Sequence, residues 1–188
     1  MSKMKVLESS GIECLQLDVA NADSITKVIQ FLERACLGKL DILVNNAGLW
    51  LETPALDIEM SMIKAMFEVN VFGPMEMVRQ CTPLLFKAKG SIVNISSILA
   101  IMPYPMTSAY NASKAALAQY SETLRLELEP LDIRVLTIMS GQVSNNLVRA
   151  PRLNEGSIYK SLEPMLVQRA RGYAGPLKSW VIAYAMSG

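Results

Sequence analysis

The sequence contains no histidine. This absence excludes a Ser-His-Asp or Cys-His triad and a histidine-ligated metal site within these 188 residues. Any acid–base chemistry must use tyrosine, lysine, carboxylate or cysteine side chains. No metal site is predicted.

The chain also lacks an excess of charge. Its 18 Lys+Arg residues against 17 Asp+Glu residues give a formal net charge of +1. No basic surface for nucleic acid is therefore predicted. The apolar run at residues 180–186 is shorter than the roughly 20 residues that span a bilayer, and no apolar signal-peptide core follows Met1.

Cysteine is scarce as well. Cys14, Cys36 and Cys81 are far apart, odd in number and form no CxxC motif. A disulfide framework is not expected, and a reducing compartment fits better. All three are predicted to be small core residues.

Short apolar runs alternate with amphipathic stretches along the chain. This alternation predicts an α/β domain whose parallel sheet is covered on both faces, that is, a doubly wound sheet. The predicted strands are residues 12–19, 40–44, 91–95 and 133–139. The predicted helices are residues 23–37, 61–86 with a break near Gly73-Pro74, and 108–128.

Unusual polar residues and glycines follow the predicted strands. Asp18 ends the first strand, residues 45–48 (Asn-Asn-Ala-Gly) follow the second, Ser96 and Ser97 the third, and Gly141 the fourth. Ligands bind at the carboxyl ends of the strands in such sheets. A binding site is therefore expected where these residues converge.

Tyr110 and Lys114 are four residues apart on a predicted helix, so their side chains share one face. A lysine ammonium favours the phenolate, and the pair is therefore expected to lower the tyrosine pKa toward the working range. Taken alone, the pair more often means a solvated lysine beside an interfacial tyrosine. Asn70 within a helix can likewise be a local backbone-bonding residue, and Asn45 and Asn46 can be ordinary turn residues.

Six short motifs, taken together, resemble those of the short-chain dehydrogenase/reductase family in order and spacing over residues 10–145. They are Leu17-Asp18-Val19, Asn45-Asn46-Ala47-Gly48, Val69-Asn70-Val71-Phe72-Gly73, Asn94-Ile95-Ser96-Ser97, Tyr110-x-x-x-Lys114 and Ser140-Gly141-x-Val143.

The resemblance implies a catalytic tetrad that reduces a small-molecule carbonyl with a hydride from NADP(H). Tyr110 would donate a proton to the carbonyl oxygen, and Ser97 would hydrogen-bond the same oxygen. Lys114 would lower the tyrosine pKa and hold the nicotinamide ribose, and Asn70 would hold a water that links Lys114 to solvent.

The resemblance also implies cofactor contacts. Asp18 would meet the adenine, and Asn46, Ala47 and Gly48 would lie on the adenosine ribose side. Val143 would meet the nicotinamide amide. Asn145 stands where the family has threonine and can still hydrogen-bond that amide.

Within the family, phrases such as TPALDIEM and MFEVNVFGPM are most similar to fungal NADPH-dependent 1-acyldihydroxyacetone-phosphate reductases. This similarity implies an acylated, phosphorylated ketone, with a fungal secondary-metabolite ketone as the alternative. It also implies a cytoplasmic location, with contact to the endoplasmic reticulum or lipid droplet surface. The lysine and arginines that could meet a phosphate are Arg149, Arg152 and Lys160, although residues 146–188 can equally form an ordinary amphipathic lid.

Members of the family begin with a strand and a Thr-Gly-x-x-x-Gly-x-Gly turn that binds the cofactor pyrophosphate. These 188 residues contain no such motif. The expected fold is therefore a Rossmann-type sheet that lacks its first βαβ unit. Residues 1–145 would form an incomplete dinucleotide-binding and catalytic domain, and residues 146–188 its substrate loop and C-terminal segment.

Two further expectations follow from the resemblance. NADPH binding by these residues alone should be weak, so the alternative function is a non-catalytic remnant or partner subunit. Assembly is expected as a homodimer or homotetramer through the helices around residues 70–87 and 108–128.

Overall fold

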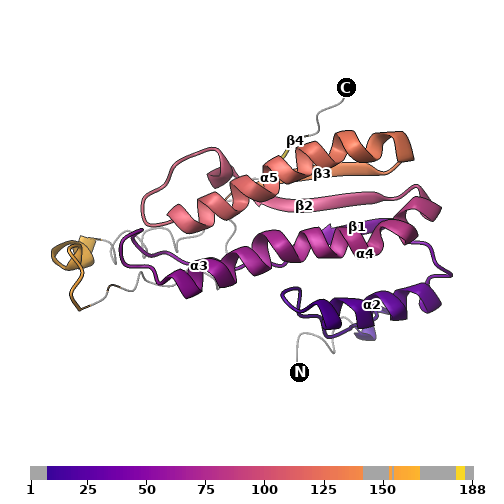
Figure 1. Ribbon diagram of the computed structural model, residues 1–188, viewed down its shortest axis with the longest axis horizontal. Coiled ribbons are helices and arrows are strands. Elements are labelled where there is room, and N and C mark those ends of the chain that lie inside the picture. The colour runs from indigo at the N-terminus through magenta and orange to yellow at the C-terminus, as the bar shows by residue number, and fades with distance from the viewer. Residues whose placement is uncertain (1–7, 142–152, 154, 166–180, 185–188) are drawn as a thin grey trace.

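The computed structural model describes residues 8–141, 153 and 155–165, and the backbone of residues 181–184. A four-stranded sheet in the order β1-β2-β3-β4 forms its centre (Figure 1). The strands are β1 (Ile42–Asn45), β2 (Ser91–Ser97), β3 (Arg134–Ser140) and β4 (Val181–Tyr184). The first three are parallel, and β4 is antiparallel to β3.

The helices run between these strands. They are α2 (Ala22–Ala35), α3 (Met60–Phe67), α4 (Gly73–Ala88) and α5 (Ser108–Leu128). A π-helical turn, Glu68–Phe72, joins α3 to α4. Short 3₁₀ turns are Ile98–Ala100, Glu129–Leu131 and Lys160–Leu162.

The core lies between one face of the sheet and helices α2, α4 and α5. Leu43 of β1, Ile92 of β2 and Val135 of β3 face these helices and are buried. Right-handed crossovers between parallel strands that advance in one direction keep all their helices on one side. The two parallel crossovers, β1 to β2 and β2 to β3, advance in that way, with α4 and α5 in their connections.

The opposite face of the sheet differs from the prediction. Ile42 and Val44 of β1 are 59% and 54% exposed, and no helix of the described residues covers them. The parallel α/β sheet is confirmed, but the described residues cover only one of its faces.

The prediction of a strand at residues 12–19 is wrong for this structure. These residues form no strand, and Ile12 is half exposed. A strand needs a neighbour to satisfy its backbone groups. No described strand pairs with this segment or with the outer edge of β1. An apolar run in the sequence is therefore not enough to predict a strand.

The prediction of two helical pieces that meet near Gly73-Pro74 is confirmed, because α3 and α4 are separate α-helices and α4 begins at Gly73. Gly73 has right-handed helical dihedral angles and begins α4, and the irregularity is the preceding π turn. A Cβ at Gly73 would lie 2.8 Å from the carbonyl oxygen of Val19. The glycine thus permits a close approach of backbone.

The cysteine prediction holds for one residue of the three. Cys81 is fully buried on α4, and burial raises the pKa of its thiol to about 11. Cys14 is half-buried, and Cys36 is exposed at the C-terminus of α2. The helix predicted at residues 23–37 is slightly too long, since α2 ends at Ala35.

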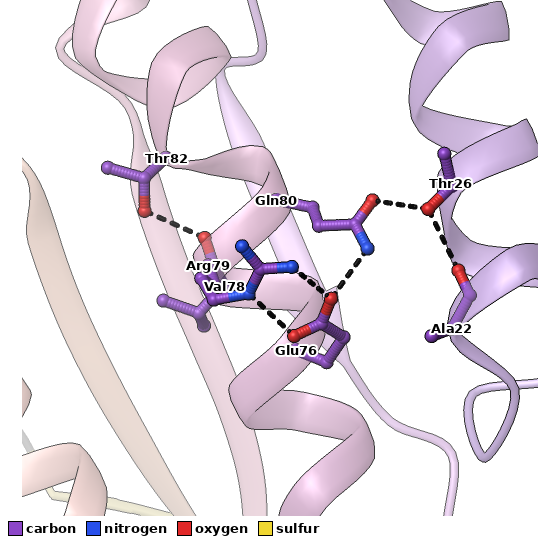
Figure 2. Close-up of polar contacts among 7 residues, drawn as sticks. All are labelled: Ala22, Thr26, Glu76, Val78, Arg79, Gln80 and Thr82. Carbon is purple, nitrogen blue, oxygen red and sulfur yellow. Dashed lines mark hydrogen bonds and ion pairs between the residues drawn. The ribbon is translucent and has the colours of Figure 1, made fainter.

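A polar bridge joins α2 to α4 (Figure 2). The Gln80 amide nitrogen donates to Glu76 at 2.6 Å, and its oxygen lies 3.2 Å from the Thr26 hydroxyl. Arg79 also donates to Glu76, and this bond is the main reason that the Glu76 pKa falls to about 2. The bridge supplements the buried contacts of Ile25 and Ile29.

Gly90 provides a test of the packing where α4 turns into β2. A Cβ at this position would lie 2.5 Å from the Leu40 oxygen and 2.8 Å from the Asp41 oxygen, so backbone would have to move. We expect Gly90→Ala to lower the free energy of unfolding by about 1–3 kcal/mol, measured by urea denaturation. Gly156→Ala is the matched control, because nothing lies within 4 Å of the added atom. Equal stability of both variants would contradict this packing.

Candidate active site

The end of β2 and the first turns of α5 bring three predicted residues together. Ser97 is the last residue of β2 and is buried. Tyr110 and Lys114 lie one turn apart near the start of α5. A hydrogen bond links the Ser97 and Tyr110 side chains, and the Lys114 nitrogen lies 5.9 Å from the centroid of the Tyr110 ring.

The Lys114 side chain is buried against the end of β2 and is not solvated. It is 4% exposed, and its Nζ donates to the Ile95 carbonyl oxygen at 2.7 Å. The Ser96 hydroxyl donates to the Lys114 carbonyl oxygen at 2.9 Å. Burial lowers the pKa of Lys114 to about 8. The alternative of a solvated lysine is therefore excluded.

The prediction of a lowered Tyr110 pKa is wrong for this structure. Burial raises the Tyr110 pKa above its ordinary value, and only the hydrogen bond to Ser97 acts in the opposite direction. Lys114, whose nitrogen lies 5.9 Å from the ring centroid, is not among the groups that shift the Tyr110 pKa, and burial dominates that shift.

Asn70 joins the loop after β1 to α5. It is fully buried in the π turn, where its Oδ1 accepts from the Leu49 N–H at 2.7 Å. Its Nδ2 donates to the Leu49 carbonyl oxygen at 3.0 Å and to the Ser113 hydroxyl at 2.9 Å. The carboxamide is thus occupied by protein groups rather than by a single local backbone bond.

A second buried amide chain crosses the sheet. Asn45 Nδ2 donates to Asn94 Oδ1 at 2.8 Å, and Asn94 Nδ2 donates to the Ser121 hydroxyl at 2.8 Å. Ser121 in turn donates to the Leu117 carbonyl oxygen. Asn45 is therefore a bonded core residue, and the interpretation of it as an ordinary turn residue is wrong.

The predicted cofactor residues differ in where they lie: one borders Lys114, three are exposed, and two are outside the described residues. A Cβ at Gly48 would lie 3.6 Å from the Lys114 nitrogen, which places this glycine in the site. Asn46 and Ala47 are exposed on the same loop. Asp18 is exposed, and its carboxylate accepts from the Ala20 N–H just before α2. Val143 and Asn145 lie outside the described residues.

Sequence reasoning missed Trp50. Its ring packs edge-on against Tyr110, with the centroids 4.5 Å apart and the planes at 66°. The only available signal was its position two residues after the Asn-Asn-Ala-Gly motif.

A separate hollow of about 380 Å³ lies beside the start of α4. Its lining includes Val19, Phe72, Glu76 and Arg79 and no member of the tetrad. Among the described residues, no cluster of acidic or cysteine side chains could hold a metal ion. In the same part of the chain, no helix is both long and apolar enough to cross a bilayer.

The family model described as short chain dehydrogenase matches residues 2–156. This chain belongs to that family. The matched range includes the tetrad positions and the carboxyl ends of all three parallel strands. The predicted family membership is confirmed.

Two relatives show how this short-chain dehydrogenase compares in length. It is 43% identical over 159 residues to the short-chain dehydrogenase fogD of Aspergillus ruber, covering 83% of this chain and 56% of the relative. It is 35% identical over 175 residues to the NADPH-dependent 1-acyldihydroxyacetone phosphate reductase of Schizosaccharomyces pombe, covering 89% and 59%. The chain thus spans a little over half the length of these relatives.

Solved structures agree with the fold. A short-chain dehydrogenase from Streptomyces avermitilis matches with a TM-score of 0.74 and 31% identity, covering 90% of this chain and 68% of that one. One from Burkholderia cenocepacia, in complex with NADP, matches with a TM-score of 0.65 and 28% identity, covering 84% and 65%.

The buried lysine predicts a pH dependence of stability. The Lys114 pKa falls from its ordinary value of 10.5 to about 8 in the fold, so the unfolded chain binds more protons between these values. The free energy of unfolding should therefore rise with pH across that interval. Between about pH 7 and 10.5, the free energy of unfolding of the wild type should rise by up to about 3 kcal/mol relative to that of Lys114→Met, as measured by urea denaturation. A constant difference between the two proteins would contradict the burial.

Proposed function

We propose that this chain carries the catalytic part of an NADPH-dependent carbonyl reductase. The observation that carries the proposal is the convergence of Ser97, Tyr110 and Lys114 at the carboxyl end of β2. NADPH, when bound, would supply a hydride to the carbonyl carbon. Tyr110 donates the proton to the carbonyl oxygen, and the Ser97 hydroxyl donates a hydrogen bond that holds that oxygen.

Lys114 suits the nicotinamide ribose. One of its N–H groups is used by Ile95, and the ammonium keeps further donors for ribose hydroxyls. Gly48 leaves room beside the nitrogen that a Cβ would reduce. These residues therefore fit one end of a dinucleotide. Below about pH 8 the lysine is mostly protonated and favours the phenolate that remains after proton donation.

Asn70 has a structural role in addition to the water that the family resemblance assigns to it. Its carboxamide is engaged with Leu49 and Ser113, so it contributes by holding the loop that carries Gly48. We keep the water next to Lys114 as a proposal, with the backbone of the π turn as its partner.

The choice of NADP(H) is supported by relatives. The Schizosaccharomyces pombe protein is named as NADPH-dependent, and the Burkholderia structure holds NADP. We propose that exposed Asn46 and Ala47 contact the adenosine side, with Asp18 near the adenine. Val143 and Asn145 remain proposed contacts of the nicotinamide amide.

We propose a ketone with a long apolar part as the substrate class, such as a 1-acyldihydroxyacetone phosphate or a comparable fungal metabolite. Exposed apolar side chains lie on the loops that follow β1 and β2, at the same end as Ser97; they are Leu49, Ile101 and Met102. Lys160 is paired with Glu163 at 2.9 Å, so it supports phosphate binding poorly. Arg149 and Arg152 lie outside the described residues.

We also propose that the protein forms a homodimer or homotetramer, with residues 146–188 as its substrate segment. Exposed Phe72 precedes α4, and exposed Phe86 and Leu126 lie on α4 and α5, which supports assembly through these helices. Contact with a lipid surface is proposed on the substrate class alone.

A titration with NADPH tests whether these 188 residues bind the cofactor without a glycine-rich turn. The 188 residues should bind NADPH weakly, because much of the affinity comes from backbone amides at the end of a glycine-rich turn. A fusion that places the N-terminal segment of the Aspergillus ruber relative before residue 1 should bind more tightly in a fluorescence titration. Micromolar binding by the 188 residues alone would show that another segment replaces the turn. No binding by a folded fusion would favour a non-catalytic partner.

The proton donor is tested by Tyr110→Phe in that fusion. Loss of the acid should reduce the rate of NADPH oxidation with a ketone by about 100- to 10,000-fold. Tyr120→Phe is the matched control, because Tyr120 lies on the same helix but packs against the hydrophobic core. Near-normal turnover by Tyr110→Phe would refute the proposed chemistry.

A further inference from the structure

Trp50 is the aromatic residue in contact with the proposed proton donor. Its ring meets the Tyr110 ring at a centroid distance of 4.5 Å and an interplanar angle of 66°. Such edge-to-face pairs contribute roughly 0.5–1.5 kcal/mol beyond the area that they bury. The contact restricts the orientation of the phenol, which Lys114 does not fix by hydrogen bonding.

The loop that carries Trp50 is fixed on both sides. Immediately before it, the Asn70 carboxamide binds both the N–H and the carbonyl of Leu49. Three residues after it, the Thr53 N–H donates to the Met106 carbonyl oxygen at 2.7 Å. Met106 lies four residues before Tyr110 and has a φ of +67°. Both the tryptophan and the tyrosine therefore have fixed backbones.

The Trp50 indole is held by packing. Its Nε1 is buried and has no hydrogen-bond partner among the described residues. An unpaired buried donor costs about 1–3 kcal/mol, which the packing of the indole ring must offset. The edge-on contact with the Tyr110 ring is part of that packing.

We propose that Trp50 is a positioning residue that holds the Tyr110 phenol toward Ser97 and keeps water from it. The inference rests on the proposed function for its role in catalysis. The contact with Tyr110 can be tested without any turnover.

Two polar side chains lie beside Tyr110, and one carboxyl group lies on the loop that carries Trp50. Ser97 at the end of β2 hydrogen-bonds Tyr110, and Lys114 on α5 is the cation beside it. Glu52, on the Trp50 loop, is half-buried, and burial raises its pKa. Burial also dominates the Tyr110 pKa. If Trp50 supplies that burial, its removal admits water and lowers the tyrosine pKa.

The test compares Trp50→Phe, which keeps an aromatic ring, with Trp50→Ala, which removes it. Leu56→Ala is the matched control, because Leu56 lies on the same loop and is 73% exposed. The Tyr110 pKa is read by NMR titration of the 188-residue chain labelled at the tyrosine ζ-carbon. The resonance is identified among the six tyrosines by its loss in Tyr110→Phe.

We expect Trp50→Ala to lower the Tyr110 pKa toward 10, while Trp50→Phe and Leu56→Ala keep the wild-type value. An unchanged pKa in a folded Trp50→Ala protein would overturn the proposal. If Trp50→Ala does not fold, a Trp50→Phe resonance that titrates near 10 would also overturn it, because the ring contact should suffice.

Kinetics in the NADPH-binding fusion then address catalysis. Trp50→Ala should reduce kcat by about 10- to 100-fold with little change in the KM for NADPH, because the proton donor is misplaced. The limb of the pH profile that reports the proton donor should move in the direction of the Tyr110 pKa. An inactive wild-type fusion would refute the proposed function and leave the NMR result standing. An active fusion with an unaffected Trp50→Ala variant would refute the positioning role.

Discussion

The Asn70 carboxamide makes the contacts on which the geometry of the site depends. Its bonds to Leu49 and Ser113 tie the loop after β1 to α5, across segments more than 20 residues apart in sequence. The residue is fully buried, so loss of one partner would leave a desolvated polar group unpaired. The π turn places the side chain there, since an ordinary helix would direct it differently.

Lys114 is also a buried polar group that needs hydrogen-bond partners. A buried ammonium is tolerated only when its donors are satisfied, and the Ile95 carbonyl oxygen at 2.7 Å satisfies one of them. The amide chain of Asn45, Asn94 and Ser121 fixes the end of β1 beside β2. Polar groups that must be bonded therefore define a rigid wall of the site, which a proton donor needs.

Much of the fold was predictable because its signals are local. The helix at residues 108–128 matches α5 at both ends, since helical periodicity and Pro130 mark it. The strands at 91–95 and 133–139 were found within two residues. Residues 12–19 carry the same apolar signal as those strands and yet form none, because a strand also needs a neighbour that periodicity does not report.

The sequence by itself determined that Tyr110 and Lys114 share one helix face, because a separation of four residues is a property of the helix alone. It also determined that polar residues end the parallel strands. Only the tertiary structure decided that burial raises the Tyr110 pKa, that Asn70 clamps Leu49, and that Trp50 packs against the phenol. Desolvation and aromatic contact depend on which distant segments meet, and that arrangement is set by packing rather than by the spacing of residues along the chain.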